Sequence, residues 1–282
     1  MTLASTVGPE HGVGGSVLAS VSTPPEGYVP PSLEEFFYDP IFGSGIFAVN
    51  RIVLMMLLMT GVLCLVFGLG FRRPQVVPRG LQNVLETGTE FVRTQIGDEV
   101  IGKEASRRFA PYLTVLFFFI LAMNITSIIP GLNLPINGLA ALPLLLAVIT
   151  WVIYNYQGAK SQGLGHYVKG SLFPPGIPGP IYLLVTPIEF VSTFVLRPIT
   201  LFIRLLANMI AGHLILGLFY SASTYLFLGY QDGRWWTALF GLGSFVGAIA
   251  FTFFEALVAV LQAYIFTLLT AVYLAGSLEP EH

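Results

Sequence analysis

Five ionisable side chains interrupt the two longest apolar tracts of this 282-residue sequence. They are, in chain order, Glu189, Arg197, Arg204, His213 and Glu255. A charge at the centre of a bilayer costs about 2.5 to 3.5 kcal/mol on insertion scales, so such residues persist mainly where they pair, line water or carry ions. A set of fixed ion pairs that only specify helix packing is the alternative, but five such residues in one region favour ion conduction.

Helical spacing arranges the polar residues of the first tract around one cation. At 100° per residue, Arg204 shares a face with Arg197, Thr200 and Asn208. His213 lies nine residues beyond Arg204, on roughly the opposite face and about 13 Å further along the axis. The first tract therefore offers a polar face that includes Arg204 and a separate imidazole beyond it.

The second tract supplies polar groups at matching depth. Glu255 and Gln262 lie seven residues apart and share a helical face. If the two tracts fold as a hairpin, Arg204 comes level with residue 258, between these two side chains. His213 and Glu255 then lie on the outer side of Arg204. The inner side holds three polar residues: Glu189, Ser192 and Arg197.

The residue types indicate proton transfer. Arginine keeps its proton at any accessible pH, so Arg204 attracts anions or repels cations but does not relay protons. Histidine and buried carboxylates titrate near neutrality and can hand protons along. The pattern predicts two offset proton half-channels with an electrostatic barrier between them. We find no metal spacing, nucleophile dyad or phosphate loop, and the single cysteine, Cys64, lies in an apolar run, so no cofactor is expected.

The composition requires a membrane around these residues. Only 10% of residues are charged and 55% are hydrophobic, whereas about 25% are charged in a typical soluble domain. We predict an all-α polytopic membrane protein with about five to six membrane helices, the last two forming a long, steeply tilted hairpin. Nothing in the sequence indicates binding to nucleic acid.

The expected segments follow from hydropathy and helical periodicity. Residues 1–45 form a flexible outer N-terminal tail, 46–71 the first transmembrane helix, 76–104 an amphipathic inner-surface helix, 108–159 two transmembrane helices, 160–180 an inner loop, 181–276 the tilted hairpin and 277–282 a C-terminal tail.

The hairpin is predicted from length. Residues 181–228 make a helix of about 72 Å and residues 235–276 one of about 63 Å, against a hydrocarbon core of about 30 Å. Either each tract breaks into two spans, or both lie steeply tilted. The matching lengths favour the tilted hairpin, which needs a large apolar partner to hold it.

Lysine and arginine counts set the predicted orientation. The connection after the first span holds seven of these residues, and residues 157–180 hold Lys160 and Lys169. The N-terminal tail holds only acids before the first span. Because basic loops stay inside, five crossings place the N-terminus outside and the C-terminus in the cytoplasm. No organelle-targeting segment is evident, so we expect a bacterial plasma membrane.

Two strings within the hairpin carry a family resemblance. Residues 197–216, RPITLFIRLLANMIAGHLIL, resemble the core motif of subunit a of rotary F-type ATP synthases, and residues 255–274, EALVAVLQAYIFTLLTAVYL, resemble that family's final helix. The resemblance implies a hairpin curved against a ring of rotor subunits that each carry one carboxylate. It further implies a peripheral stalk subunit and a catalytic head elsewhere, so the chain itself is expected to have no catalytic site.

The resemblance also implies residue roles. Arg204 falls on the essential stator arginine, and Asn208, His213, Glu255 and Gln262 fall on positions around the two aqueous half-channels. The acid and the imidazole at positions 213 and 255 are exchanged relative to some bacterial members.

These assignments give one expected proton route. Asn208, His213 and Glu255 line the outer half-channel, and Glu189, Ser192 and Arg197 line the inner one. Thr200 and Gln262 are expected to hold the Arg204 guanidinium by hydrogen bonds. A transporter that works alone, a core subunit of a redox-driven pump and a purely structural anchor remain the alternatives; internal inverted repeats, typical of the first, are not found.

Overall fold

The computed structural model describes residues 28, 30–32, 36, 40–42, 49–129, 134–173, 181–228 and 235–278. Several predicted segments fall wholly or partly outside these ranges: most of the N-terminal tail, the end of the inner loop at 174–180, the turn of the hairpin at 229–234 and the C-terminal tail from 279 onward.

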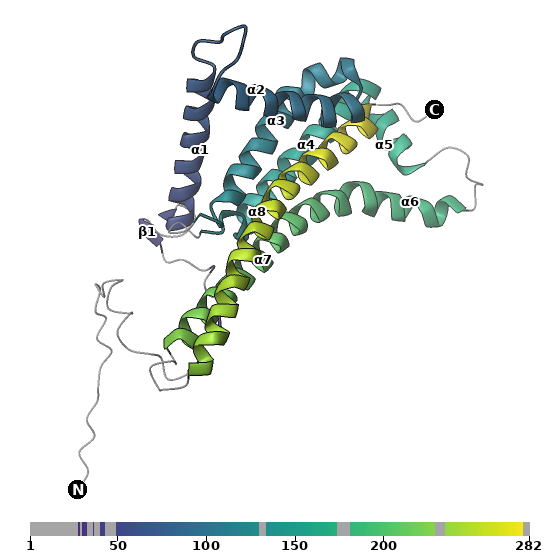
Figure 1. The fold of residues 1–282 in the computed structure, drawn as a ribbon. Coiled ribbons are helices and arrows are strands. Elements are labelled where there is room, and N and C mark those ends of the chain that lie inside the picture. Colours follow the sequence, from purple (N-terminus) through teal and green to yellow (C-terminus); the bar gives the residue numbers. More distant parts are fainter. Residues whose placement is uncertain are drawn as a thin grey trace.

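Within the described ranges, five helices are long and apolar enough to cross a membrane, which confirms the predicted all-α polytopic class. They are α1 (Arg51–Gly70), α3 (Lys103–Ile125), α4 (Ala141–Gln162), the continuous helix Tyr182–Leu228, and α8 (Trp235–Leu278). Figure 1 shows α1 standing apart from a bundle in which α3, α4, α7 and α8 cross.

A short antiparallel pair of strands leads into the first span. Strand β1 (Pro40–Phe42) pairs with β2 (Val49–Asn50). Asn50 then caps α1, because its side-chain oxygen accepts a hydrogen bond of 2.9 Å from the Val53 amide. Most of α1 stays exposed in the isolated chain, as expected of a helix surrounded by lipid or partner helices.

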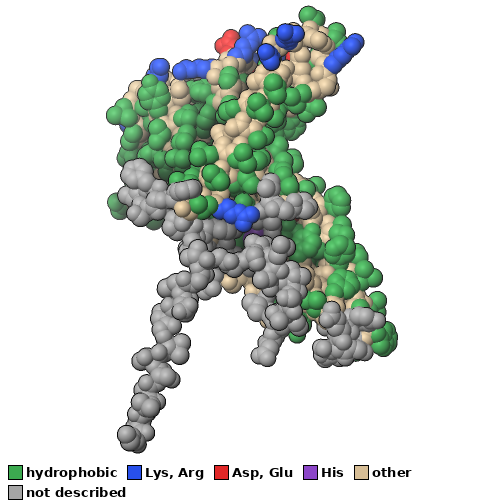
Figure 2. All heavy atoms as spheres, turned by 90° about the vertical axis from the view of Figure 1, so that its left-hand side faces the viewer, with side chains coloured by type: hydrophobic (Ala, Val, Ile, Leu, Met, Phe, Trp, Pro, Cys, Tyr) green, Lys and Arg blue, Asp and Glu red, His purple; other side chains and the backbone are tan. Residues whose placement is uncertain are grey.

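The predicted amphipathic segment forms α2 (Leu81–Phe91) followed by a π-helix, η4 (Val92–Asp98). Its apolar side buries Leu85, Val92 and Ile96. Gly88 lets the helix approach α3, because a Cβ there would overlap the ring of Phe118. Figure 2 shows Lys and Arg side chains gathered at this end of the molecule, above a hydrophobic surface.

The expected inner loop contains a short helix, α5 (Leu164–Leu172). Gly163 has φ of 83°, a left-handed conformation that ends α4 and starts α5. Tyr167 packs against Gly158 of α4 and donates a 3.1 Å hydrogen bond to Asn155 Oδ1. The helix therefore folds back on α4 and leads toward the hairpin.

The hairpin consists of two unbroken helices. Helix α6 (Tyr182–Phe190), the π-helix η7 (Val191–Leu196) and α7 (Arg197–Leu228) form one helix of 47 residues, about 70 Å long. Helix α8 has 44 residues, about 66 Å. In Figure 1, α7 lies along α8 and α6 bends away from it. A π-helical stretch is a common cause of such a bend.

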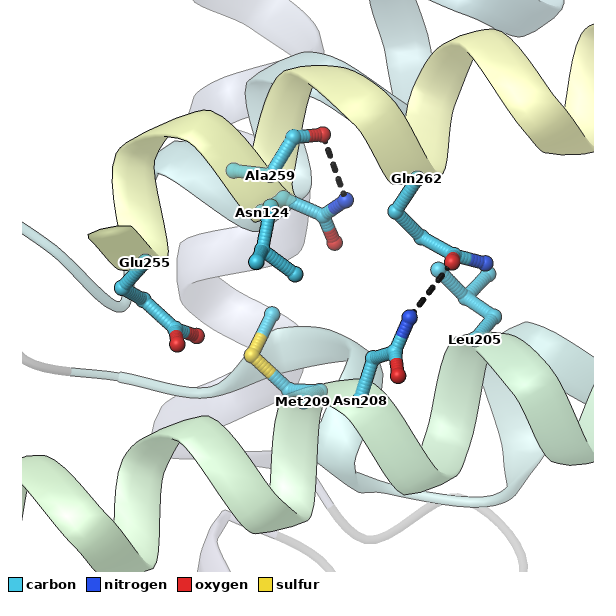
Figure 3. Close-up of a pocket in the computed structure, with 8 residues that line it drawn as sticks. Asn124, Leu205, Asn208, Met209, Glu255, Ala259 and Gln262 are labelled. Atoms are coloured by element: carbon cyan, nitrogen blue, oxygen red, sulfur yellow. Dashed lines mark hydrogen bonds between the residues drawn. The ribbon is translucent and has the colours of Figure 1, made fainter. Parts of the chain in front are cut away.

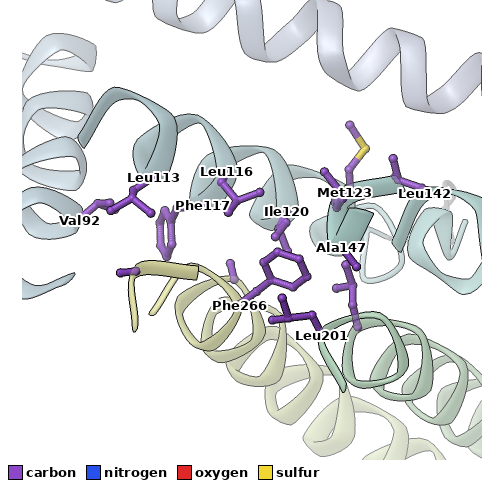
Figure 4. Close-up of a cluster of buried hydrophobic side chains, with 14 of the residues drawn as sticks. Val92, Leu113, Leu116, Phe117, Ile120, Met123, Leu142, Ala147, Leu201 and Phe266 are labelled. Carbon is purple, nitrogen blue, oxygen red and sulfur yellow. The ribbon is translucent and has the colours of Figure 1, made fainter. Parts of the chain in front are cut away.

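The buried core joins the hairpin to the remaining spans. Figure 4 shows Ile120 of α3, Ala147 of α4, Leu201 of α7 and Phe266 of α8 in one cluster, with Val92 of η4 at its edge. These side chains are nearly or fully buried. The core therefore fixes the first part of α7 and the second half of α8 against α3 and α4, next to the candidate site.

Candidate functional site

Arg204 lies on an exposed face of α7, with exposed apolar Ile203 and Ala207 as close neighbours in sequence. Among the residues that the structure describes, the one ion pair joins Arg93 to Glu90, 3.6 Å apart at the other end of the molecule. Within this chain the guanidinium is therefore not held by any described carboxylate, and it faces outward from the hairpin.

Asn208 and Gln262 meet one turn away from Arg204. Asn208 Nδ2 donates a 2.6 Å hydrogen bond to Gln262 Oε1, which joins α7 to α8 (Figure 3). Thr200 Oγ1 donates instead to the Arg197 carbonyl at 3.0 Å. In this structure neither Thr200 nor Gln262 accepts a hydrogen bond from the Arg204 guanidinium. Their support of Arg204 therefore stays a prediction.

A small cavity of about 10 Å³, enough for about one water molecule, lies beside this amide pair. Figure 3 shows the side chains that converge on it from α3, α7 and α8. The lining residues are Asn124, Leu205, Asn208, Met209, Glu255, Val258, Ala259 and Gln262. Three amides and one carboxyl group among them give a water molecule donors and acceptors.

Glu255 is buried against the backbone of α7. Its carboxylate lies where a Cβ on Gly212 would be, so only glycine leaves room for it. His213, the residue after Gly212, is also buried. The side chains of His213 and Glu255 are each 5% exposed. The structure therefore brings the predicted acid and the predicted imidazole to the same level of the hairpin.

The register of the hairpin differs from the expected one. A turn centred in the connecting segment places residue 208 opposite 254, but the structure pairs Asn208 with Gln262 and Gly212 with Glu255. Arg204 accordingly lies beyond both contacts, toward α6, rather than between Glu255 and Gln262. The position of a turn defines where the chain reverses, whereas packing against α3 and α4 sets how the two helices cross.

Asn124 and Asn137 belong to the site, although the sequence analysis did not include them. Asn137 Nδ2 donates to Asn124 Oδ1 at 2.7 Å, and Asn124 Nδ2 donates to the Ala259 carbonyl at 3.3 Å. Asn137 is fully buried beyond the end of α3. The signal was available, because an amide within the apolar span 103–125 needs a partner.

The predicted inner residues occupy the start of the long helix. Glu189 in α6 and Ser192 in η7 are partly exposed. Two donors of α4 reach the π-helix: Tyr154 Oη donates to the Thr193 carbonyl at 3.0 Å, and Trp151 Nε1 donates to the Phe194 carbonyl at 3.1 Å. These bonds stabilise the irregular backbone beside Ser192.

Arg197 lies on the same side of the molecule as these groups. Its guanidinium carbon is 5.3 Å from the centre of the Tyr273 ring of α8, a cation–π contact. The structure thus keeps Glu189, Ser192 and Arg197 apart from the Asn208–Glu255 group, with Arg204 between the two groups along the helix.

The space occupied by Glu255 leads to a prediction. Gly212→Ala is expected to displace the carboxylate and destabilise the protein by about 1 to 3 kcal/mol, the usual cost of overpacking a close contact. Gly243→Ala is the control, since a Cβ on Gly243 meets open space. Thermal unfolding of the detergent-solubilised protein measures the change. Equal unfolding midpoints for the two variants would show that the close contact has no role.

Comparison with known proteins identifies the family of this chain. The family described as ATP synthase A chain matches residues 53–275. The chain is 46% identical over 255 residues to ATP synthase subunit a of Rhodococcus erythropolis (strain PR4), covering 89% of this chain and 90% of that protein. It is 42% identical over 261 residues to the subunit a of Frankia alni, covering 90% and 87%. The chain therefore belongs to the ATP synthase subunit a family.

Proposed function

We propose that this multi-pass membrane protein is the proton-conducting stator subunit of a rotary F-type ATP synthase. The observation that carries the proposal is the position of Arg204: it lies on the open side of a long hairpin, is held by no described carboxylate, and separates two polar groups. Family membership supports the same assignment. The catalytic head is a separate part of such a complex, so no chemistry on nucleotides is assigned to this chain.

The outer half-channel is assigned to the side of Glu255. Protons move through water beside the amides of Asn137 and Asn124 to the water-sized cavity near Asn208, and the amides orient that water by hydrogen bonds. Glu255, which is buried beside Gly212, holds and releases them together with His213. A proton then neutralises a carboxylate on a rotor subunit, which lets that carboxyl group face lipid at low cost.

The inner half-channel is assigned to Glu189, Ser192 and Arg197. After nearly a full rotation the rotor carboxyl group reaches this side and loses its proton. Arg204 attracts the resulting carboxylate and blocks direct proton flow between the two half-channels. Each proton that crosses 100 mV releases about 2.3 kcal/mol, so several protons are needed for each ATP formed.

The surface of the hairpin supports a rotor ring as the partner. Helix α8 exposes Phe253, Phe254 and Leu257 near the level of the site, and α7 exposes Ile203 beside Arg204. Helices of this length need an apolar partner or lipid along them, because five spans alone do not cover them. A peripheral stalk subunit is assigned to another exposed surface, such as that of α1.

The charge distribution supports one orientation. Residues 71–108 and 157–180 carry nine of the 13 lysine and arginine residues, so this end faces the cytoplasm. The N-terminus is then outside and the C-terminus inside. The compared relatives come from bacteria, so the plasma membrane of a bacterium is the proposed location.

Cross-linking tests the interface. With Cys64→Ala as background, Ala207→Cys is expected to form a disulfide with a cysteine placed beside the rotor carboxylate, in native membranes under oxidation. Val62→Cys is the matched control, because it is exposed on α1. Disulfides are detected by non-reducing electrophoresis. A cross-link from position 62, with none from position 207, would place the rotor against α1 and contradict this proposal.

A further inference from the structure

The described residues of the N-terminal segment contact one row of side chains on α7. Tyr28 Oη lies 3.1 Å from Ser221 Oγ and 3.4 Å from the Leu218 carbonyl. Its ring centre is 5.6 Å from that of Tyr225. Both ring and hydroxyl are therefore engaged near the end of α7 that leads into the hairpin turn.

The contacts continue along the same row toward the site. Pro31 packs on Gly217, since its Cβ lies 3.2 Å from the position that a Cβ on Gly217 would take. Phe36 then meets His213, with ring centres 5.3 Å apart and planes at 72°. The α7 residues concerned are Tyr225, Ser221, Gly217 and His213, each four residues from the next.

A spacing of four residues describes one ridge of an α-helix. From Tyr225 to His213 this ridge is about 18 Å long, and an extended chain from Tyr28 to Phe36 can span about 27 Å. The three N-terminal contacts thus follow the ridge in order and in the opposite direction to α7. Such agreement among separate contacts indicates a docking register rather than one chance contact.

Phe36 closes the row beside the proposed proton path. It is only 5% exposed. On its other side lies η5 (Ile136–Gly138), where a Cβ on Gly138 would overlap the Phe36 ring. Gly138 directly follows Asn137, which starts the chain of amides leading to the cavity. Phe36 therefore sits between the imidazole and the outer end of that chain.

We propose that the described residues of the N-terminal segment (28, 30–32 and 36) form an outer wall of the half-channel, with Phe36 as a positioning residue for His213. This inference rests on the proposed function, in which His213 handles protons. The Phe36 ring carries no group that binds a proton, so it confines water to the side of the amides and limits the rotation of the imidazole. The titratable group on the facing helix is Glu255 of α8. Its carboxylate touches Gly212, the residue before His213.

An engineered disulfide tests the docking separately from proton transport. In a Cys64→Ala background, Pro31→Cys with Gly217→Cys is expected to cross-link readily, because the two Cβ positions are close to the 3.5–4.5 Å of natural disulfides. Pro31→Cys with Gly243→Cys is the control, since Gly243 has open space around its Cβ position. Peptide mass spectrometry identifies the bond. Equal cross-linking of both pairs, or no cross-linking of either, would overturn the proposal that these N-terminal residues dock on α7.

Phe36 variants test the positioning. Phe36→Ala is expected to move the midpoint of the pH dependence of ATP-driven proton pumping by about half a pH unit, whereas Phe36→Leu, which keeps most of the bulk, moves it less. An unchanged midpoint in Phe36→Ala vesicles, with the 31–217 cross-link still forming, would overturn the positioning role. The cross-link does not depend on rotor contact. The pumping midpoint does depend on the proposed function, which the Arg204 variant and the Ala207 cross-link test separately.

Discussion

Replacing Arg204 with alanine is expected to abolish ATP-driven proton pumping by the assembled complex, with a loss of about 100-fold or more, while ATP hydrolysis in detergent continues. Without Arg204 an ionised rotor carboxylate lies in the membrane without a counter-charge, which costs about 2.5 to 3.5 kcal/mol, and about 2.7 kcal/mol corresponds to a 100-fold change in rate. Pumping is measured by fluorescence quenching in vesicles, and hydrolysis by phosphate release from the solubilised complex.

The structure indicates that this variant will still assemble. Removing one partner of a buried ion pair leaves an uncompensated charge and destabilises a fold. Arg204 has no such partner among the described residues and lies exposed on α7, so its removal leaves no orphaned carboxylate. A loss of pumping in Arg204→Ala therefore reports on function rather than on folding.

Two further variants make the result specific. Arg93→Ala removes an exposed cation of η4 that pairs with Glu90, and it is expected to pump nearly normally, since exposed pairs contribute about 0 to 1 kcal/mol. Arg204→Lys keeps a charge but not the planar donor group, and intermediate or absent pumping is expected. Robust coupled pumping by Arg204→Ala would remove the basis for the stator assignment.

The sequence predicted the architecture well because its signals are local. Apolar length predicted the spans, and the matched lengths of the last two tracts favoured two long helices, which the structure contains. The choice of Arg204 also used a local signal, an arginine at mid-tract in a span where charge is costly. Such features depend on composition within a few turns of helix and not on tertiary contacts.

The parts that the sequence missed depend on contacts between distant segments. Asn124 meets Ala259, 135 residues away, and no spacing rule relates them. In the sequence Gly212 is an ordinary small residue, and only the structure shows that the Glu255 carboxylate packs against it. Phe36 lies in a segment without helical periodicity, so nothing in its neighbourhood indicated contact with His213.

The π-helix η7 is a further such case. The sequence placed Glu189 and Ser192 only by their distance along the helix, and nothing in residues 191–196 indicated a π-helical backbone. Because a π-helix takes up an additional residue in each turn, the directions of these two side chains relative to Arg204 do not follow 100° per residue. The donors that stabilise η7, Trp151 and Tyr154, come from α4, which the sequence treated only as a span.

Exchanging the acid and the imidazole is the second large test. His213→Glu with Glu255→His is expected to retain more proton flux than either single variant, because the pair keeps one carboxylate and one imidazole at one level of the hairpin. His213→Glu alone places two carboxylates there, and Glu255→His places two imidazoles. Like groups at close range oppose each other's ionisation, so each single variant is expected to lose about tenfold or more of the flux.

The exchange needs a control that separates the effect of packing at position 255 from the effect of charge. Gly212 accommodates a carboxylate at position 255, and an imidazole is bulkier, so part of the loss in Glu255→His comes from packing. Glu255→Gln separates the two effects, since it keeps the shape and removes the charge. If Glu255→Gln conducts protons as well as the native chain does, the side chain at position 255 contributes only by packing and its charge has no role. If both single exchanges equal the double, the two residues act independently. Recovery in the double variant, together with lost flux in Glu255→Gln, would support a shared relay, because an ionising carboxylate and an imidazole are then both required at this level of the hairpin.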